Sequence, residues 1–174
     1  MAAYNYRDGQ SWEISFEALP RTLEEMQALP QAALKSPADT AALAVAAFCL
    51  YPENKEEAKR MIAWLSGPRE LTPMYWSFIN DRFMDNVDYI PRSYFTGATP
   101  ENDYTPDQPY TLRMWDDPNS HADPSYCKVL LESGAADSPR QIQLRLKPST
   151  GQYFLWEQFI LVGIRKPVSR DEWA

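Results

Sequence analysis

The sequence of 174 residues is poor in the side chains that build metal and redox sites. It contains one histidine and two cysteines, and it has no CxxC pair. A structural zinc site usually takes four cysteine or histidine ligands, and a disulfide framework needs more than two cysteines. We therefore predict no metal site and no cofactor, and we interpret Cys49 and Cys127 as small buried apolar residues.

Runs of positive charge are also missing. The chain has 17 Lys and Arg against 24 Asp and Glu, a formal net charge of −7 at pH 7, and no basic run longer than two residues. Nucleic-acid-binding domains usually carry a basic face, and anionic membrane surfaces attract basic clusters. The sequence therefore predicts neither a nucleic-acid nor a membrane partner. It leaves an unidentified protein or a small molecule as the expected ligand.

Long apolar runs are absent as well. The longest, from Thr40 to Tyr51, is about half of a membrane-spanning helix. The first residues, MAAYNYRDGQSWEISF, lack the charged and apolar regions of a secretory signal. We therefore expect a cytoplasmic location.

The first half of the chain carries helical patterns. Ser36, Asn54 and Thr72 stand before apolar stretches, where N-cap residues are expected. The stretch between Thr40 and Tyr51 is apolar nearly all round, which is typical of a helix buried on several sides. Main helices are expected over residues 36–51, 54–65 and 72–86, with a short helix over 22–29.

The second half carries strand patterns, in which apolar and polar residues alternate. Strands are expected over residues 110–114, 126–132, 141–147 and 152–164, with a further short strand over 12–16. The last strand is apolar on both faces, so it is either central or broken by a bulge near Glu157. We predict one α+β domain over residues 1–174, with three main helices packed on an antiparallel meander of about four strands.

Residues 87–109 form an unusual segment, with four prolines, four aromatic residues and neither a helical nor a strand period. An ordered stretch of this length without regular structure is often functional. Its aromatic side chains could line a groove for a peptide or a platform for sugar rings, or they could simply cover one side of the core. The candidate binding residues are Tyr89, Tyr94, Phe95 and Tyr104, together with Trp115.

His121 is the only histidine, and it lies in the loop WDDPNSHADPSYC between two expected strands. It could form an acid–base pair with a nearby aspartate, with Ser125 or Cys127 as the nucleophile. The Asp, Asn and Pro residues of the loop are equally typical of a turn. Counted from Asp117, the loop lacks the glycine and the glutamate of an EF-hand, so calcium binding is not predicted.

Three long strings resemble a family of uncharacterised bacterial domains from gut Firmicutes that carries only a domain-of-unknown-function label. They are RSYFTGATPENDYTPDQPY, SGAADSPRQIQLR and FLWEQFILVGIRKP. The resemblance implies no activity and no site residue. It does imply that the 87–109 segment is part of the domain rather than a disordered insert.

Taken together, the sequence favours a non-catalytic binding or interaction module of a bacterial protein. It shows no metal cluster, no nucleophile motif and no phosphate-binding loop. The first alternative is a domain that binds a carbohydrate or other small ligand in an aromatic cleft. The second alternative is a hydrolase that uses His121 with a nearby aspartate.

Overall fold

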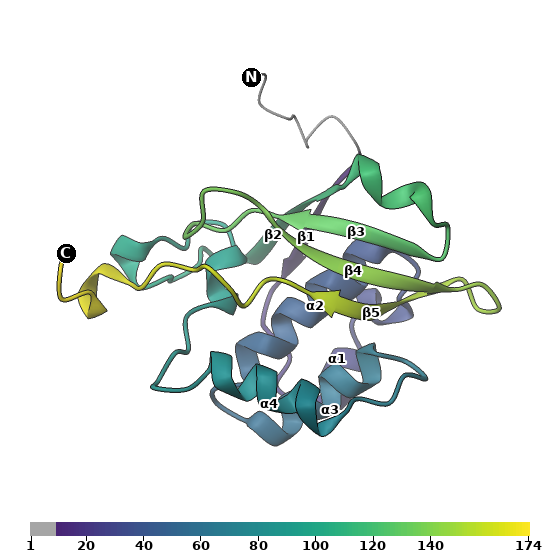
Figure 1. The fold of residues 1–174 in the computed structure, drawn as a ribbon, viewed down its shortest axis with the longest axis horizontal. Coiled ribbons are helices and arrows are strands. Elements are labelled where there is room, and N and C mark those ends of the chain that lie inside the picture. The colour runs from purple at the N-terminus through teal and green to yellow at the C-terminus, as the bar shows by residue number, and fades with distance from the viewer. Residues whose placement is uncertain (1–9) are drawn as a thin grey trace.

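The computed structural model describes residues 10–174, apart from the side chain of His121. In this part of the chain, helices cover one face of an antiparallel sheet (Figure 1). The helices are α1 (Leu23–Gln27), α2 (Pro37–Leu50), α3 (Lys55–Leu65) and α4 (Pro73–Arg82). The strands are β1 (Ser11–Phe16), β2 (Tyr110–Asp116), β3 (Tyr126–Leu131), β4 (Arg140–Lys147) and β5 (Gln152–Gln158). The predicted α+β class is confirmed.

The helices begin at their capping residues. Thr22, Ser36, Asn54 and Thr72 each accept a hydrogen bond from a first-turn backbone amide of the helix that follows. These bonds satisfy amides that have no partner within the helix. Helix α4 ends before the predicted residue 86, because the backbone beyond it turns left-handed at Asp85–Asn86, with φ of 60° and 61°.

Helix α2 lies at the centre of the core. Every residue from Thr40 to Phe48 is fully buried, and the helix contacts α3 on one side and the strands β1, β3, β4 and β5 on the other. Its alanines let these neighbours approach closely, as its apolar circumference predicts. Across residues 10–174, neither α2 nor any other helix has the length and hydropathy to span a membrane.

The strands lie in the order β1-β2-β3-β4-β5, with all neighbours antiparallel. The short strand expected over residues 12–16 is the fifth member of the sheet, and it pairs with β2 although the two are far apart in the sequence. The last strand is shorter than predicted and lies at the sheet edge rather than at its centre. The register between β4 and β5 shifts at Gln143/Leu144, opposite Trp156, so the predicted bulge is present one residue before Glu157.

The 87–109 segment is ordered by hydrogen bonds to the rest of the domain. It contains two short 3₁₀ turns, Pro91–Tyr94 and Pro100–Asn102. The Tyr94 hydroxyl donates to the backbone oxygen of Ile160 at 2.5 Å. The segment therefore forms a fixed wall beside α2 and the start of β2, as the sequence resemblance implies.

Candidate functional site

The five aromatic residues chosen from the sequence are buried. Tyr89, Tyr94, Phe95, Tyr104 and Trp115 are between 0% and 7% exposed. The rings of Tyr89 and Tyr104 stack on each other with centroids 5.6 Å apart, and burial raises the pKa of Tyr104 to about 12. A stacking platform needs an exposed ring face, which these buried rings do not offer, and all of them except Trp115 belong to the hydrophobic core. Of the five, only Phe95 lines the cavity described below.

The aspartates around His121 stabilise turns. Asp117 accepts a hydrogen bond from the amide of Asn119 at 2.9 Å, and Asp123 accepts one from the amide of Ser125 at 2.9 Å. The side chain of His121 lies outside the described residues. Burial raises the pKa of the Cys127 thiol to about 12, so this thiol is protonated at neutral pH and is not an activated nucleophile.

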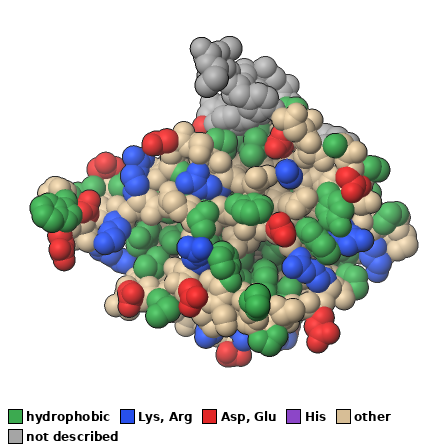
Figure 2. Space-filling view, viewed as in Figure 1, with side chains coloured by type: hydrophobic (Ala, Val, Ile, Leu, Met, Phe, Trp, Pro, Cys, Tyr) green, Lys and Arg blue, Asp and Glu red, His purple; other side chains and the backbone are tan. Residues whose placement is uncertain are grey.

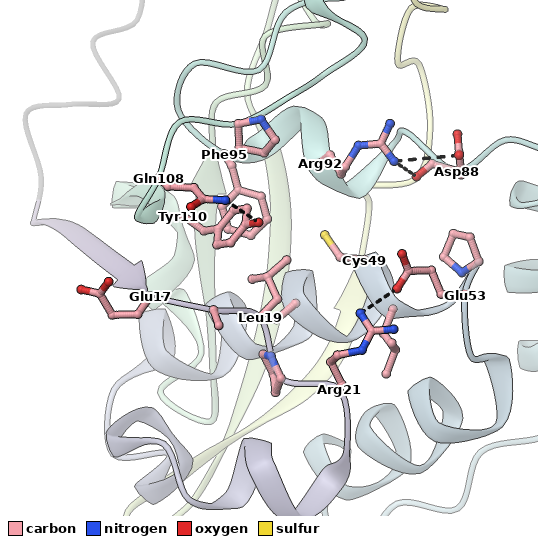
Figure 3. A pocket seen from close by; sticks show the side chains of 16 residues that line it. Glu17, Leu19, Arg21, Cys49, Glu53, Asp88, Arg92, Phe95, Gln108 and Tyr110 are labelled. Atoms are coloured by element: carbon pink, nitrogen blue, oxygen red, sulfur yellow. Dashed lines mark hydrogen bonds and ion pairs between the residues drawn. The ribbon is translucent and has the colours of Figure 1, made fainter.

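A cavity of about 670 Å³ opens between the helices and the irregular segments of the fold (Figure 3). Its walls come from the connection between β1 and α1, the second half of α2, and the stretch from Asp88 to Tyr110. The 87–109 segment thus contributes a wall, although mostly through residues other than the predicted aromatics. The volume is within the usual range for a small-molecule site.

The floor of the cavity is apolar. Ala46, Cys49 and Leu50 face it from α2, and Phe95 closes it from the 87–109 segment. Burial raises the pKa of the Cys49 thiol to about 12. This cysteine is therefore neutral at physiological pH, and it contributes a small weakly polar surface rather than a reactive thiolate.

The rim of the cavity carries polar and charged groups from three segments. Arg21 Nη1 lies 3.1 Å from Glu53 Oε2, and both side chains are more than half exposed. The Gln108 side-chain amide donates to the Tyr110 hydroxyl at 3.2 Å, and the partly exposed Tyr110 ring meets Phe95 edge to face, with centroids 5.7 Å apart. An exposed ion pair of this kind separates at little cost, so these groups can turn toward a ligand.

Arg92 fixes the wall of the cavity. Its guanidinium donates to three backbone oxygens, those of Asp88 (3.0 Å), Asp103 (3.2 Å) and Tyr104 (3.2 Å). These bonds join the two ends of the 87–109 segment. Arg170 Nη2 also lies 2.8 Å from Asp88 Oδ1. Arg92 is therefore a structural residue that also presents positive charge to the cavity.

The charges around the cavity balance. Glu17, Glu53 and Asp88 line it together with Arg21 and Arg92, and Asp88 is paired with Arg170 from outside. Among the described side chains, no group of three or more His, Cys, Asp and Glu residues could hold a metal ion. The arrangement can donate and accept hydrogen bonds, and it favours no strong net charge in a ligand.

The sequence interpretation missed the polar rim. It weighted the aromatic residues of the 87–109 segment and passed over Arg92, Gln108 and Tyr110. A proline precedes Arg92 and another stands between Gln108 and Tyr110, and both prolines mark backbone of fixed shape. That signal could have identified these positions as anchored rather than solvated.

Comparison with known protein families identifies one that spans most of the chain. Residues 18–168 match the family model DUF6935, described as a domain of unknown function. The chain belongs to the DUF6935 family. The predicted membership in a family without an assigned function is confirmed. No curated protein and no solved structure matches the chain. All the residues that line the cavity, except Glu17, lie within the matched DUF6935 span.

Proposed function

We propose that this DUF6935 domain is a non-catalytic binding module that holds a small, neutral, polyhydroxylated ligand of the carbohydrate type in the cavity walled by the 87–109 segment. The observation that carries the proposal is the combination of an aromatic ring, an amide and ion-paired side chains around one apolar floor. A sugar presents an apolar ring face and a polar edge, and this site offers a complement to each.

The charge balance supports a neutral ligand. A strongly anionic ligand would face the carboxylates of Glu17, Glu53 and Asp88, and a strongly cationic one would face Arg21 and Arg92. In either case, side chains of the same charge as the ligand would lie close to it, and the repulsion would weaken binding. Hydroxyl groups can accept from the guanidinium groups and donate to the carboxylates, and hydrogen bonds to charged groups are the stronger kind.

Two of the side chains described at the cavity, those of Cys49 and Arg92, are held in states that suit binding rather than catalysis. The thiol of Cys49 is held protonated by burial. The guanidinium of Arg92 is occupied by three backbone oxygens. Neither residue is arranged to act as a nucleophile or a general acid–base group.

The first experiment is a thermal-shift screen against mono- and oligosaccharides, amino acids and nucleotides, followed by calorimetric titration of the hits. A ligand at 100 times its dissociation constant stabilises a protein by about 2.7 kcal/mol. We expect a sugar to raise the melting temperature of the wild-type protein. Tyr110→Ala and Gln108→Ala should weaken its binding by roughly tenfold or more, the effect of losing one hydrogen bond or ring contact.

The matched control is Tyr126→Ala, which removes a partly exposed tyrosine on the outer face of the sheet and should leave sugar binding unchanged. If no sugar stabilises the wild-type protein, or if Tyr110→Ala binds as tightly as the wild type, the carbohydrate proposal is wrong.

We further propose a bacterial origin among gut Firmicutes and a cytoplasmic location. The sequence resemblance supports the origin. Both cysteines are free and at least partly buried, as is usual for thiols in a reducing compartment.

A further inference from the structure

A second concave surface lies on the other side of β5, away from the cavity. We call it the basic groove and define it by Arg69, Arg145, Lys147, Phe154 and Trp156, which line a volume of about 490 Å³. It lies between the turn after α3 and the outer face of β4 and β5. Figure 2 shows basic and hydrophobic side chains next to each other over the β5 and α4 region.

The groove is built by close packing of the turn after α3 against β5. Gly67 has a φ of 64°, and a Cβ atom at this position would lie 2.7 Å from the ring of Phe154. A larger residue is therefore excluded both by backbone conformation and by space. This packing brings Arg69 over β5, where its Nη1 donates to the backbone oxygen of Trp156.

Two guanidinium groups lie against the ring of Trp156. The distances to its centroid are 4.5 Å for Arg69 and 4.8 Å for Arg145. Arg145 also lies 5.3 Å from the ring centroid of Tyr126. These contacts orient the planar guanidinium of Arg145, which forms no hydrogen bond or ion pair with any side chain or backbone group in residues 10–174. An oriented guanidinium with free N–H groups is suited to bidentate binding of a carboxylate.

The charge of the basic groove is opposite to that of the whole chain. Three cationic side chains line it, and no Asp or Glu is found among its described lining residues. The chain as a whole carries a formal net charge of −7. A concentration of positive charge in an acidic protein attracts an acidic partner and orients its approach.

An apolar end continues from the basic groove. A second hollow of about 240 Å³ shares Arg69 and Trp156 with it. The exposed rings of Phe78 (44%) and Phe159 (42%) line this hollow, and Glu157 is the carboxylate among its described lining residues. Exposed aromatic side chains gathered at one place are typical of a protein interaction site.

The edge of β5 is not available for strand addition along its first half. The amide of Tyr153 donates to Leu34 O at 2.8 Å, and the Thr40 hydroxyl donates to Tyr153 O at 2.6 Å. Arg69 occupies the oxygen of Trp156. A partner at this surface is therefore recognised through side chains rather than by an added strand.

We infer that the basic groove and its apolar end bind an acidic peptide segment of another protein. Asp or Glu side chains of that segment pair with Arg145 and Lys147, and an aromatic or aliphatic side chain enters the apolar end between Phe78 and Phe159. The concave shape of the groove and its aromatic end favour a peptide with acidic and apolar side chains over a flat anionic membrane or a nucleic acid.

The test is selection of a displayed random-peptide library on the wild-type protein, followed by titration of the enriched peptides. We expect enriched sequences in which Asp or Glu adjoins an aromatic or aliphatic residue. Arg145→Glu should weaken their binding by at least roughly tenfold, as expected when an attractive charge pair becomes repulsive. Because Arg145 is exposed, its variant should melt within about 2 °C of the wild-type protein.

The matched control is Arg113→Glu, the same change at another exposed arginine, located on β2 and 3.6 Å from Glu13. It should bind the peptides like the wild type. The inference is overturned if no peptide is enriched or if the enriched peptides are neutral or basic. It is also overturned if both variants lose peptide affinity equally. Titration with phosphatidylserine vesicles adds a further arm, and binding to vesicles without binding to acidic peptides would also overturn it.

Discussion

The 87–109 segment and the basic groove contain similar aromatic residues but use them in opposite ways. In the segment, Tyr94 and Tyr104 are buried, and the hydroxyl of Tyr104 donates to Arg165 O at 2.7 Å. In the groove, Trp156 is partly exposed and contacts two guanidinium groups. Aromatic density in a sequence therefore marks a place where packing is important, without showing whether the rings face the core or a partner.

The largest expected difference between the two regions is in stability. Tyr104→Ala removes a fully buried ring and should lower the free energy of unfolding by about 3–5 kcal/mol, because it leaves a cavity and unpairs Arg165 O. Tyr126→Ala removes a partly exposed ring on the outer face and should cost about 1 kcal/mol. Urea denaturation at 25 °C measures both changes. Equal losses would show that the two sets of rings do not differ in their role.

A smaller difference in stability is expected between the alanine variants of Arg92 and Arg145. Arg92→Ala removes three hydrogen bonds to backbone oxygens and should cost about 2–3 kcal/mol. Arg145→Ala removes only ring contacts at an exposed site, and the expected loss is about 0.5 kcal/mol. Native-state hydrogen exchange is the sharper measurement here. The amides of residues 87–109 should exchange faster in the Arg92 variant than in the wild type, and at the wild-type rate in the Arg145 variant. The reverse pattern would contradict this assignment.

The last effect is confined to alkaline pH. Burial raises the pKa of Tyr104 to about 12, above the value of about 10 for an exposed tyrosine. The unfolded chain therefore loses this proton first, so the stabilising contribution is complete below about pH 10 and is lost as the pH rises toward 12. Tyr104→Phe should flatten the decline of stability between pH 10 and 12 in urea titrations, and Tyr126→Phe serves as the control. An unchanged slope for Tyr104→Phe would refute the assignment.

The regular elements could be predicted because local rules determine them. Thr22, Ser36, Asn54 and Thr72 begin helices at the expected positions, and the alternation from Tyr110 onward gives the strands. The position of β5 at the edge could not be predicted, since a strand with two apolar faces fits either a central position or an edge covered on both sides. One of its outer apolar residues, Phe154, packs against the turn at Gly67.

The candidate site was predicted only in part. The 87–109 segment was correctly singled out as an ordered region, because its prolines and aromatics are unusual together. The exposure of each ring depends on contacts that are distant in sequence, such as that of Tyr94 with Ile160, and no local pattern encodes these. The polar rim of Arg21, Gln108 and Tyr110 forms only when the β1–α1 connection meets the start of β2.

The most direct test of the binding proposal is a nitrogen-15 NMR titration of the wild-type protein with the sugar that gives the largest thermal shift. We expect saturable shifts of backbone amides in residues 17–21, in the second half of α2 and from Asp88 to Tyr110, with the strands β4 and β5 unaffected. Shifts confined to the basic groove, or no shifts at any sugar concentration, would contradict the assignment of the cavity as the ligand site.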